Sequence, residues 1–153
     1  MIHLQVSESF FEALPALLQD LSFLERAGLE ALQQAGSSPV SLTIVIGDDA
    51  QLHELNRQFL GVDAPTDVLS FPADDTDPDS GERYIGDILI SYPRAAAQAA
   101  SAGHAVQDEL QLLVVHGVLH LLGFDHAVPA EKTRMWNVQA QVLNSLGSRL
   151  NPP

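Results

Sequence analysis

Three histidines stand close together at the start of the last quarter of the chain, in the segment HGVLHLLGFDH at 116–126. His116 and His120 are four residues apart, so in a helix they project from the same face. Gly123 allows the chain to turn after that helix, because glycine adopts positive φ without steric cost. Such a turn would bring His126 back beside the other two histidines, and three converging neutral imidazoles form an open metal site. The open position would hold water or substrate, as a catalytic metal requires.

The surroundings of these histidines favour a metal over a set of core histidines. The side chains near His116 and His120 are almost all apolar, and a buried imidazole without a partner costs about 1–3 kcal/mol. All-nitrogen ligation suits Zn²⁺ best, although Ni²⁺, Cu²⁺ and Fe²⁺ also accept it. The spacing equals the HExxHxxGxxH of metzincin proteases, but Gly117 stands where a protease needs its glutamate base. The pattern therefore argues against peptide hydrolysis by the usual route.

Composition limits the classes of protein that carry such a site. With 153 residues, 46% hydrophobic and 18% charged, the chain fits one globular domain over 1–153. The absence of cysteine excludes disulfide scaffolds, thiolate zinc sites and cysteine nucleophiles. No basic signal-peptide region and no apolar run of about 18–20 residues is present, so we expect a soluble, cytoplasmic protein without a membrane partner. The net charge of −13, with only seven Lys and Arg, means that a polyanionic substrate must be captured locally.

The elements that must position the histidines follow from periodicity and from turn residues. We expect the order β-α-β-α-β-β-α-α-α in a single α/β (α+β) domain, with a mixed sheet of about four strands and a central histidine helix. The expected strands are 2–6, 40–46, 67–71 (stopped by Pro72) and 84–91. The first expected helix carries Leu17, Leu18, Leu21, Leu24 and Leu32 and stops at 36–39. The second begins at Asp48 or Asp49 and ends at Gly61. Three more are expected from Pro93 to about Ala102, from Val106 to Leu122, and from Pro129 to a stop at Gly147.

An acidic segment joins the last two expected strands. Five carboxylates fall within DDTDPDSGE at 74–82. We interpret the segment as a solvated connection rather than a calcium loop, because the DxDxDG spacing of an EF-hand is absent. Two strands separated by such a polar loop suggest a hairpin.

Three blocks of sequence, taken in order, resemble one known family. Leu55-Asn56 with DAPTDVLSFP at 63–72 is similar to an LN…D-x-PT-D/N-VLSFP block, and GDI at 86–88 with Ile90-Ser91 is similar to a GDI-x-IS strand. Gly103-His104 and Glu109-Leu110 fit the region ahead of the third block, HGVLHLLGFDH. These blocks resemble those of the YbeY family, the bacterial rRNA-maturation endoribonucleases, and the resemblance extends from about Val40 to Leu146.

The resemblance implies an activity and a cofactor. It implies a zinc-dependent, single-strand-directed endoribonuclease that acts on ribosomal RNA in its maturation and quality control. His116, His120 and His126 match the family's three metal ligands one by one, with one Zn²⁺ per chain. Such a metal could polarise a phosphate oxygen or lower the pKa of a coordinated water. The nucleophile and the general base stay open.

One residue departs from the family pattern. The family usually has an arginine after the aromatic residue of LN-x-x-Y/F-R, where a guanidinium can grip a phosphate, but here Phe59 is followed by Leu60. Arg57 lies one helical turn earlier, so it is a candidate substrate-binding residue, with a solvated arginine as the alternative.

The missing arginine and the acidic net charge also favour a second function, a ribosome-assembly factor that binds a ribosomal protein or a ribosome-associated GTPase, with weak or no catalysis. A generic metal-dependent hydrolase is a third reading.

Other polar residues have less specific expectations. Asp125 is either an acceptor for an imidazole N–H or a turn-former at the end of the helix. Asp87 is either a carboxylate of the cleft or a residue of the sheet edge, and His104 lies either near the site or at a helix end on the surface. Ordinary structural roles are expected for His3, His53 and Met135.

Overall fold

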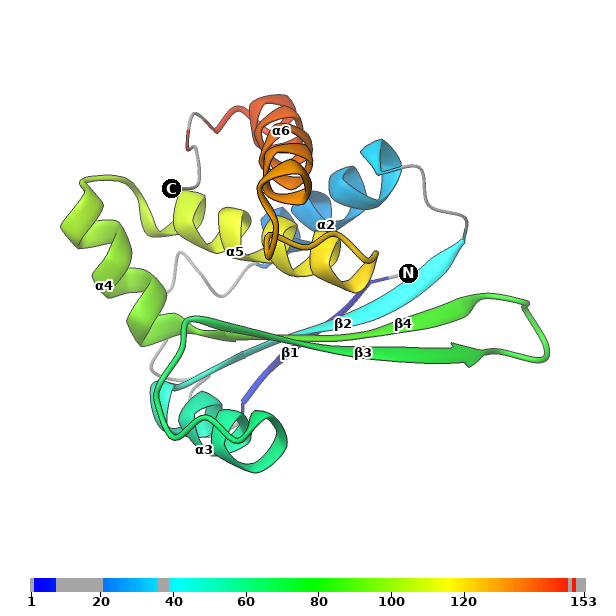
Figure 1. The fold of residues 1–153 in the computed structure, drawn as a ribbon, viewed down its shortest axis with the longest axis horizontal. Helices are drawn as coiled ribbons and strands as arrows, with labels where there is room; N and C mark the ends of the chain where they lie inside the picture. Colours follow the sequence, from blue (N-terminus) through cyan, green and yellow to red (C-terminus); the bar gives the residue numbers. More distant parts are fainter. Residues whose placement is uncertain (1, 8–20, 36–38, 149, 151–153) are drawn as a thin grey trace.

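A mixed four-stranded sheet carries the helices of this chain (Figure 1). The computed structural model describes residues 2–7, 21–35, 39–148 and 150. The strands are β1 Ile2–Val6, β2 Val40–Gly47, β3 Val68–Thr76 and β4 Arg83–Ser91. The helices are α2 Ser22–Gln34, α3 Asp49–Leu60, α4 Tyr92–Ala102, α5 Val106–Leu121 and α6 Pro129–Ser145. Over the described residues the predicted order of elements is confirmed; the expected helical positions Leu17 and Leu18 and the stop at 36–38 lie outside them.

The strand order β1-β2-β4-β3 places β2 and β4 in the interior of the sheet. β2 runs parallel to both β1 and β4, whereas β3 is antiparallel to β4, with Leu69 opposite Leu89. The two interior strands are almost entirely buried and rich in Ile, Leu and Val, as expected of strands covered on both faces. The predicted mixed sheet of about four strands and the predicted hairpin are therefore confirmed.

The prediction that Pro72 stops its strand is wrong. β3 continues to Thr76, and Pro72 pairs in register with Gly86 before an irregularity that ends at Asp75. β3 is an edge strand, and an edge strand tolerates proline because the missing N–H would otherwise face solvent. The acidic segment forms the end of this hairpin, where the Asp77 N–H donates to the Glu82 carbonyl at 2.9 Å.

Helices cover both faces of the sheet. Figure 1 shows α2, α5 and α6 on one face and α3 on the other. The larger core joins α2, α5 and α6 to the inner faces of β2 and β4, while a smaller one joins Leu52 of α3 to Leu69 and Leu89. The predicted central position of the histidine helix is confirmed, because α5 contacts α2, α4, α6 and the two strands of the hairpin. None of the helices in the described ranges combines the length and the apolar character needed to cross a membrane.

Gly117 lets α5 lie unusually close to β4. A Cβ built on Gly117 would lie 2.8 Å from Cγ2 of Ile88, which is fully buried. The position that holds the glutamate base in metzincin proteases therefore faces the sheet here and has no room for a side chain. The close contact between Gly117 and Ile88 therefore sets the distance between β4 and the helix that carries the histidines.

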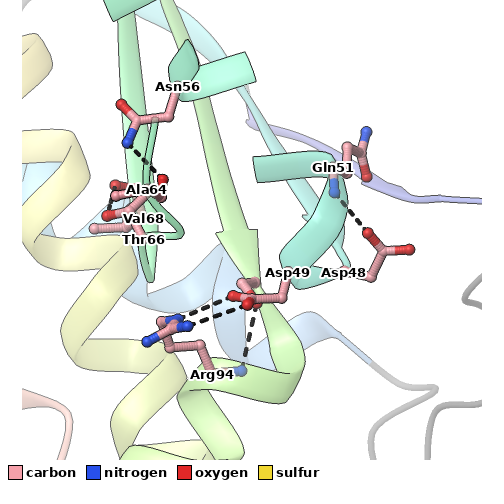
Figure 2. A network of polar contacts seen from close by, with 9 residues as sticks. Asp48, Asp49, Gln51, Asn56, Ala64, Thr66, Val68 and Arg94 are labelled. Carbon is pink, nitrogen blue, oxygen red and sulfur yellow. Dashed lines mark hydrogen bonds and ion pairs between the residues drawn. The ribbon is translucent and has the colours of Figure 1, made fainter. Parts of the chain in front are cut away.

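A helix cap, an ion pair and a side-chain hydrogen bond hold α3 in place beside α4 and the segment that leads into β3 (Figure 2). Asp48 caps α3, its Oδ1 accepting the Gln51 N–H at 2.7 Å. Asp49 receives two hydrogen bonds from Arg94 of α4, at 2.9 and 3.1 Å, which lower the pKa of the carboxyl. Asn56 is buried and donates to the Ala64 carbonyl at 3.0 Å, which holds the connection that leads into β3.

Candidate metal centre

The last turns of α5 bring two imidazoles together. His116 and His120 project from the same face of the helix, with their Nε2 atoms 3.1 Å apart. Their ring centroids are 4.6 Å apart with the rings nearly perpendicular. The predicted convergence of the i and i+4 side chains is confirmed.

A tight turn returns the third histidine to the pair. Gly123 adopts a φ of +98° just beyond the end of α5, where its N–H donates to the His120 carbonyl at 3.0 Å. The His126 ring centroid then lies 5.1 Å from that of His120 and 5.7 Å from that of His116. One nitrogen from each of the three rings lies within 4.8 Å of the others, so the group could hold a metal ion. Glycine's freedom at positive φ is what makes this return possible, as the sequence predicts.

The cluster is electrostatically suited to a cation. Burial, together with the neighbouring His120 and His126, lowers the pKa of His116 to about 4. Burial and His126 also lower the pKa of His120. Both imidazoles are therefore neutral at neutral pH, with lone pairs available for coordination. Three imidazole nitrogens beside an open cleft fit a divalent ion of the Zn²⁺ type.

Gln139 of α6 orients His116, and sequence reasoning did not find it. The Nδ1 of His116 lies 3.0 Å from the Gln139 Oε1. An amide oxygen only accepts, so Nδ1 carries the proton and Nε2 keeps its lone pair toward the other histidines. Gln139 is completely buried, and its Nε2 has no hydrogen-bond partner within the described residues. The sequence did offer one signal for Gln139: it is a polar residue on the same helix face as the buried Met135, Val142 and Leu143.

We expect Gln139→Leu to weaken metal binding by about 10–100-fold, the usual cost of losing the partner that orients a histidine ligand. Gln139→Glu keeps an acceptor at the same place and should retain tight binding. Competition with a chelator of known affinity measures both variants. The leucine also removes the unpartnered amide, so the metal-free protein should unfold at a similar temperature. Wild-type affinity in Gln139→Leu would contradict the role given to this residue.

The histidines line one side of an open cleft of about 420 Å³, here called the histidine cleft. Its opposite wall comes from β3 and the residues before it. The remaining lining residues are Leu60, Asp67, Val68, Leu69, Ser70 and Pro72. Leu60 is 54% exposed, so the residue that departs from the family pattern stands at the rim of this cleft.

The other predicted candidates lie in several places. Asp125 accepts the His126 N–H at 2.7 Å, which is the turn-forming role. Asp87 accepts a hydrogen bond from Tyr84 and, as the residue two before Leu89, lies on the sheet face that α3 covers, away from the histidines. His104 pairs with Glu109 at 2.6 Å. His53 pairs with Asp63 at 2.7 Å; His3 is exposed on β1, and Met135 is a buried core residue as expected.

Arg57 lies in the last turn of α3, exposed, with its Nε donating to a Glu54 oxygen at 3.2 Å. To contact RNA at the histidine cleft, its guanidinium would have to leave Glu54. If it does so, Arg57→Ala should weaken RNA binding several-fold and reduce the salt dependence by about 0.7 in log–log slope. Leu60→Arg, at the cleft rim, should strengthen binding in the same assay, and Arg83→Ala is the control. Equal affinity of wild type and Arg57→Ala would contradict the compensation.

A three-histidine cluster in an open cleft, on a mixed α/β fold, is the arrangement of a catalytic metal centre rather than a structural one. The family model described as "Endoribonuclease YbeY" matches residues 18–147. The chain belongs to this family.

Named relatives agree over most of the chain. An Endoribonuclease YbeY from Roseiflexus castenholzii is 46% identical over 138 residues, which cover 86% of this chain and 87% of the relative. One from Chloroflexus aurantiacus is 49% identical, covering 84% and 88% of the two chains. The solution structure of TM1509 from Thermotoga maritima has the same fold, with a TM-score of 0.59, 23% identity and coverage of 95% and 91%.

Proposed function

We propose that this chain is a metal-dependent endoribonuclease that cuts single-stranded RNA during the maturation of ribosomal RNA. The observation that carries the proposal is the group of three histidines in an open cleft, in a chain of the Endoribonuclease YbeY family. We assign His116, His120 and His126 as ligands of one Zn²⁺, and the whole chain, 1–153, as one domain. Because this function is carried out in the cytoplasm, we propose that location for the chain.

The chain's own residues prepare the cleft for a phosphodiester. When bound, the metal would supply a Lewis acid for a phosphate oxygen and activate a water molecule. Gln139 keeps His116 in the tautomer that presents Nε2 to the cluster. The β3 wall, with Val68 and Ser70, limits the space on the other side of the histidines. A single strand can place its backbone in this cleft, whereas the stacked pairs of a duplex hold the backbone in a fixed helical form.

Two cations beside the cluster suit a polyanion. Lys132 Nζ lies 5.5 Å from the centroid of the Trp136 ring, and Arg134 lies over Phe124 at 4.6 Å. Trp136 in turn lies 5.6 Å from the ring of His126. Within the described part of the chain, neither cation forms an ion pair, whereas each of the arginines 57, 83 and 94 pairs with a carboxylate. We expect these two charges to attract the RNA backbone toward the histidines of an otherwise acidic protein.

We therefore expect the double variant Lys132→Gln and Arg134→Gln to raise the KM for RNA about 10-fold at low salt, with kcat nearly unchanged. Each lost phosphate contact should also reduce the salt dependence of binding by about 0.7 in log–log slope. Arg83→Gln, on the distant hairpin, is the matched control and should behave as wild type. An unchanged KM and salt slope in the double variant would contradict the phosphate contacts.

A second candidate is a ribosome-assembly factor that binds a ribosomal protein or a ribosome-associated GTPase. The end of α3 carries exposed apolar side chains, with Phe59 66%, Leu60 54% and Val62 48% exposed. Such a run suits a protein contact better than a nucleic-acid contact. Co-purification with ribosomal subunits by a chain without RNA cleavage would favour this candidate.

The test of the first candidate uses the purified full-length chain with its metal content measured. The protein is stripped with a chelator, reloaded with Zn²⁺, and given one RNA sequence either as a single strand or annealed to its complement. We expect cleavage of the single strand only, lost on chelation and restored by the metal. Cleavage that survives chelation, or stoichiometric metal without cleavage, would refute the proposal.

A further inference from the structure

A second cavity adjoins the histidine cleft. It has a volume of about 440 Å³ and lies between α4, α5 and α6; we call it the Trp136 cleft. His116, Asp67 and Val68 line both cavities, so the two are direct neighbours on either side of these residues. The Trp136 cleft is therefore within reach of the nucleotide next to one held at the histidines.

The lining of the Trp136 cleft combines a mainly apolar surface with a few polar groups. Leu112, Leu113 and Trp136 are among its apolar lining residues. At another part of the lining, Glu109 is only 6% exposed, and one of its carboxylate oxygens lies 2.6 Å from the His104 Nε2. Volumes of about 300–1,000 Å³ with convergent polar groups in an apolar lining are typical of ligand sites.

The position of Trp136 connects this cleft to the chemistry. Its ring centroid lies 5.9 Å from that of His116 and 5.6 Å from that of His126. Lys132 approaches the same ring, which puts a positive charge beside the aromatic surface. An aromatic ring beside a cation is the pair of groups with which proteins hold single-stranded nucleic acid, one for the base and one for the phosphate.

We propose that the Trp136 cleft is a nucleobase subsite, which takes the base of the nucleotide next to the cleaved phosphate. This inference rests on the proposed function, since it gives the RNA strand its position at the same site. The base packs beside Trp136, and the His104–Glu109 pair offers hydrogen-bonding groups to its edge. Because the base is held through its ring surface, we expect little dependence on base identity.

A binding experiment tests the subsite without catalysis. Trp136 is the only tryptophan of the chain, so its fluorescence reports directly on this cleft. Adenosine 5′-monophosphate is titrated into the metal-free, full-length protein and should quench the fluorescence to saturation. Ala102 lines the cleft and is exposed at the end of α4, so Ala102→Phe fills the cleft at little expense to the core. Ala100→Phe is the matched control, because the exposed Ala100 points about 200° away around the same helix.

We expect wild type and Ala100→Phe to bind the nucleotide alike and Ala102→Phe to bind at least 5-fold more weakly. Saturable quenching that is the same in all three proteins would overturn the proposal, as would the absence of quenching. Trp136→Leu, followed by calorimetry, should show a comparable loss, which separates stacking from a change in fluorescence alone.

Cleavage of modified RNA locates the base. A series of single-stranded substrates carries one abasic nucleotide at successive positions around the cut. We expect a loss of about 5- to 150-fold at one position beside the cleaved phosphate, the value of one stacked base. Ala102→Phe should show little further loss with that substrate. Equal rates along the series would overturn the subsite while leaving the nuclease intact, whereas a wild type that cuts no RNA would refute the proposed function and leave nucleotide binding to decide the subsite.

Discussion

His120→Ala is expected to abolish both metal binding and RNA cleavage while leaving the protein folded. His120 provides one of three nitrogens that lie within 4.8 Å of one another, and two imidazoles alone do not complete the site. Removing a residue that only hydrogen-bonds to a metal ligand lowers the metal affinity about 10–100-fold. Removing the ligand itself should therefore lower the affinity by more than about 100-fold. The half-buried ring has a lowered pKa because of its burial, so its removal takes away a desolvated group and should not destabilise the fold.

Three measurements check this prediction together. Metal content is measured after dialysis, cleavage is measured with single-stranded RNA, and folding is followed by circular dichroism. His53→Ala is the matched control, because His53 lies on α3 and pairs with Asp63 outside the cluster, and it should retain metal and activity. If His120→Ala keeps stoichiometric metal and full cleavage, the three-histidine site is refuted.

Gly86→Ala is expected to destabilise the protein by about 2–6 kcal/mol, from backbone strain of ~1–3 kcal/mol and overpacking of ~1–3 kcal/mol. Gly86 has a φ of +140°, and a Cβ there would lie 2.2 Å from the Phe71 carbonyl oxygen. That oxygen belongs to the backbone of the neighbouring strand, so it cannot move aside without breaking the hairpin register. The same Cβ would lie 2.9 Å from Leu121, at the end of the histidine helix.

Urea denaturation of the metal-free protein measures this loss. Gly81→Ala is the control: Gly81 also has a positive φ, +73°, but a Cβ there meets nothing within 4 Å. It should therefore lose only about 1 kcal/mol, from strain alone. Equal losses in the two variants would show that the contact with Phe71 and Leu121 contributes nothing.

The histidine cluster could be predicted from sequence because all of its members are local. His116 and His120 needed only a helix, and His126 needed only the turn at Gly123, so no distant contact had to be known. Gln139 and Trp136 could not be found in this way, since they reach the histidines only through the packing of α6 on α5. The cleft walls were hidden for the same reason, because β3 supplies them through tertiary pairing.

The ends of helices and strands were predictable where a single residue determines the local backbone conformation. Gly61 and Gly103 end α3 and α4 in the left-handed conformation, as their positions in the sequence indicate. Pro72 misled because its effect depends on whether the strand is internal or at the edge, which the sequence does not reveal. The effect of Gly117 was foreseen only as a missing base, whereas its packing against Ile88 gives the glycine a structural reason.

The nearness of the three histidines along the chain has a consequence for folding. An ion held by His116, His120 and His126 would close a loop of only about ten residues, and closing so short a loop removes little entropy from the unfolded chain. The ion would therefore brace the turn after α5 and contribute little to the cohesion of the sheet, which depends on its own apolar core. Stability and reactivity would thus be separated, because the scaffold depends on its own apolar core and the three histidines on a short local turn.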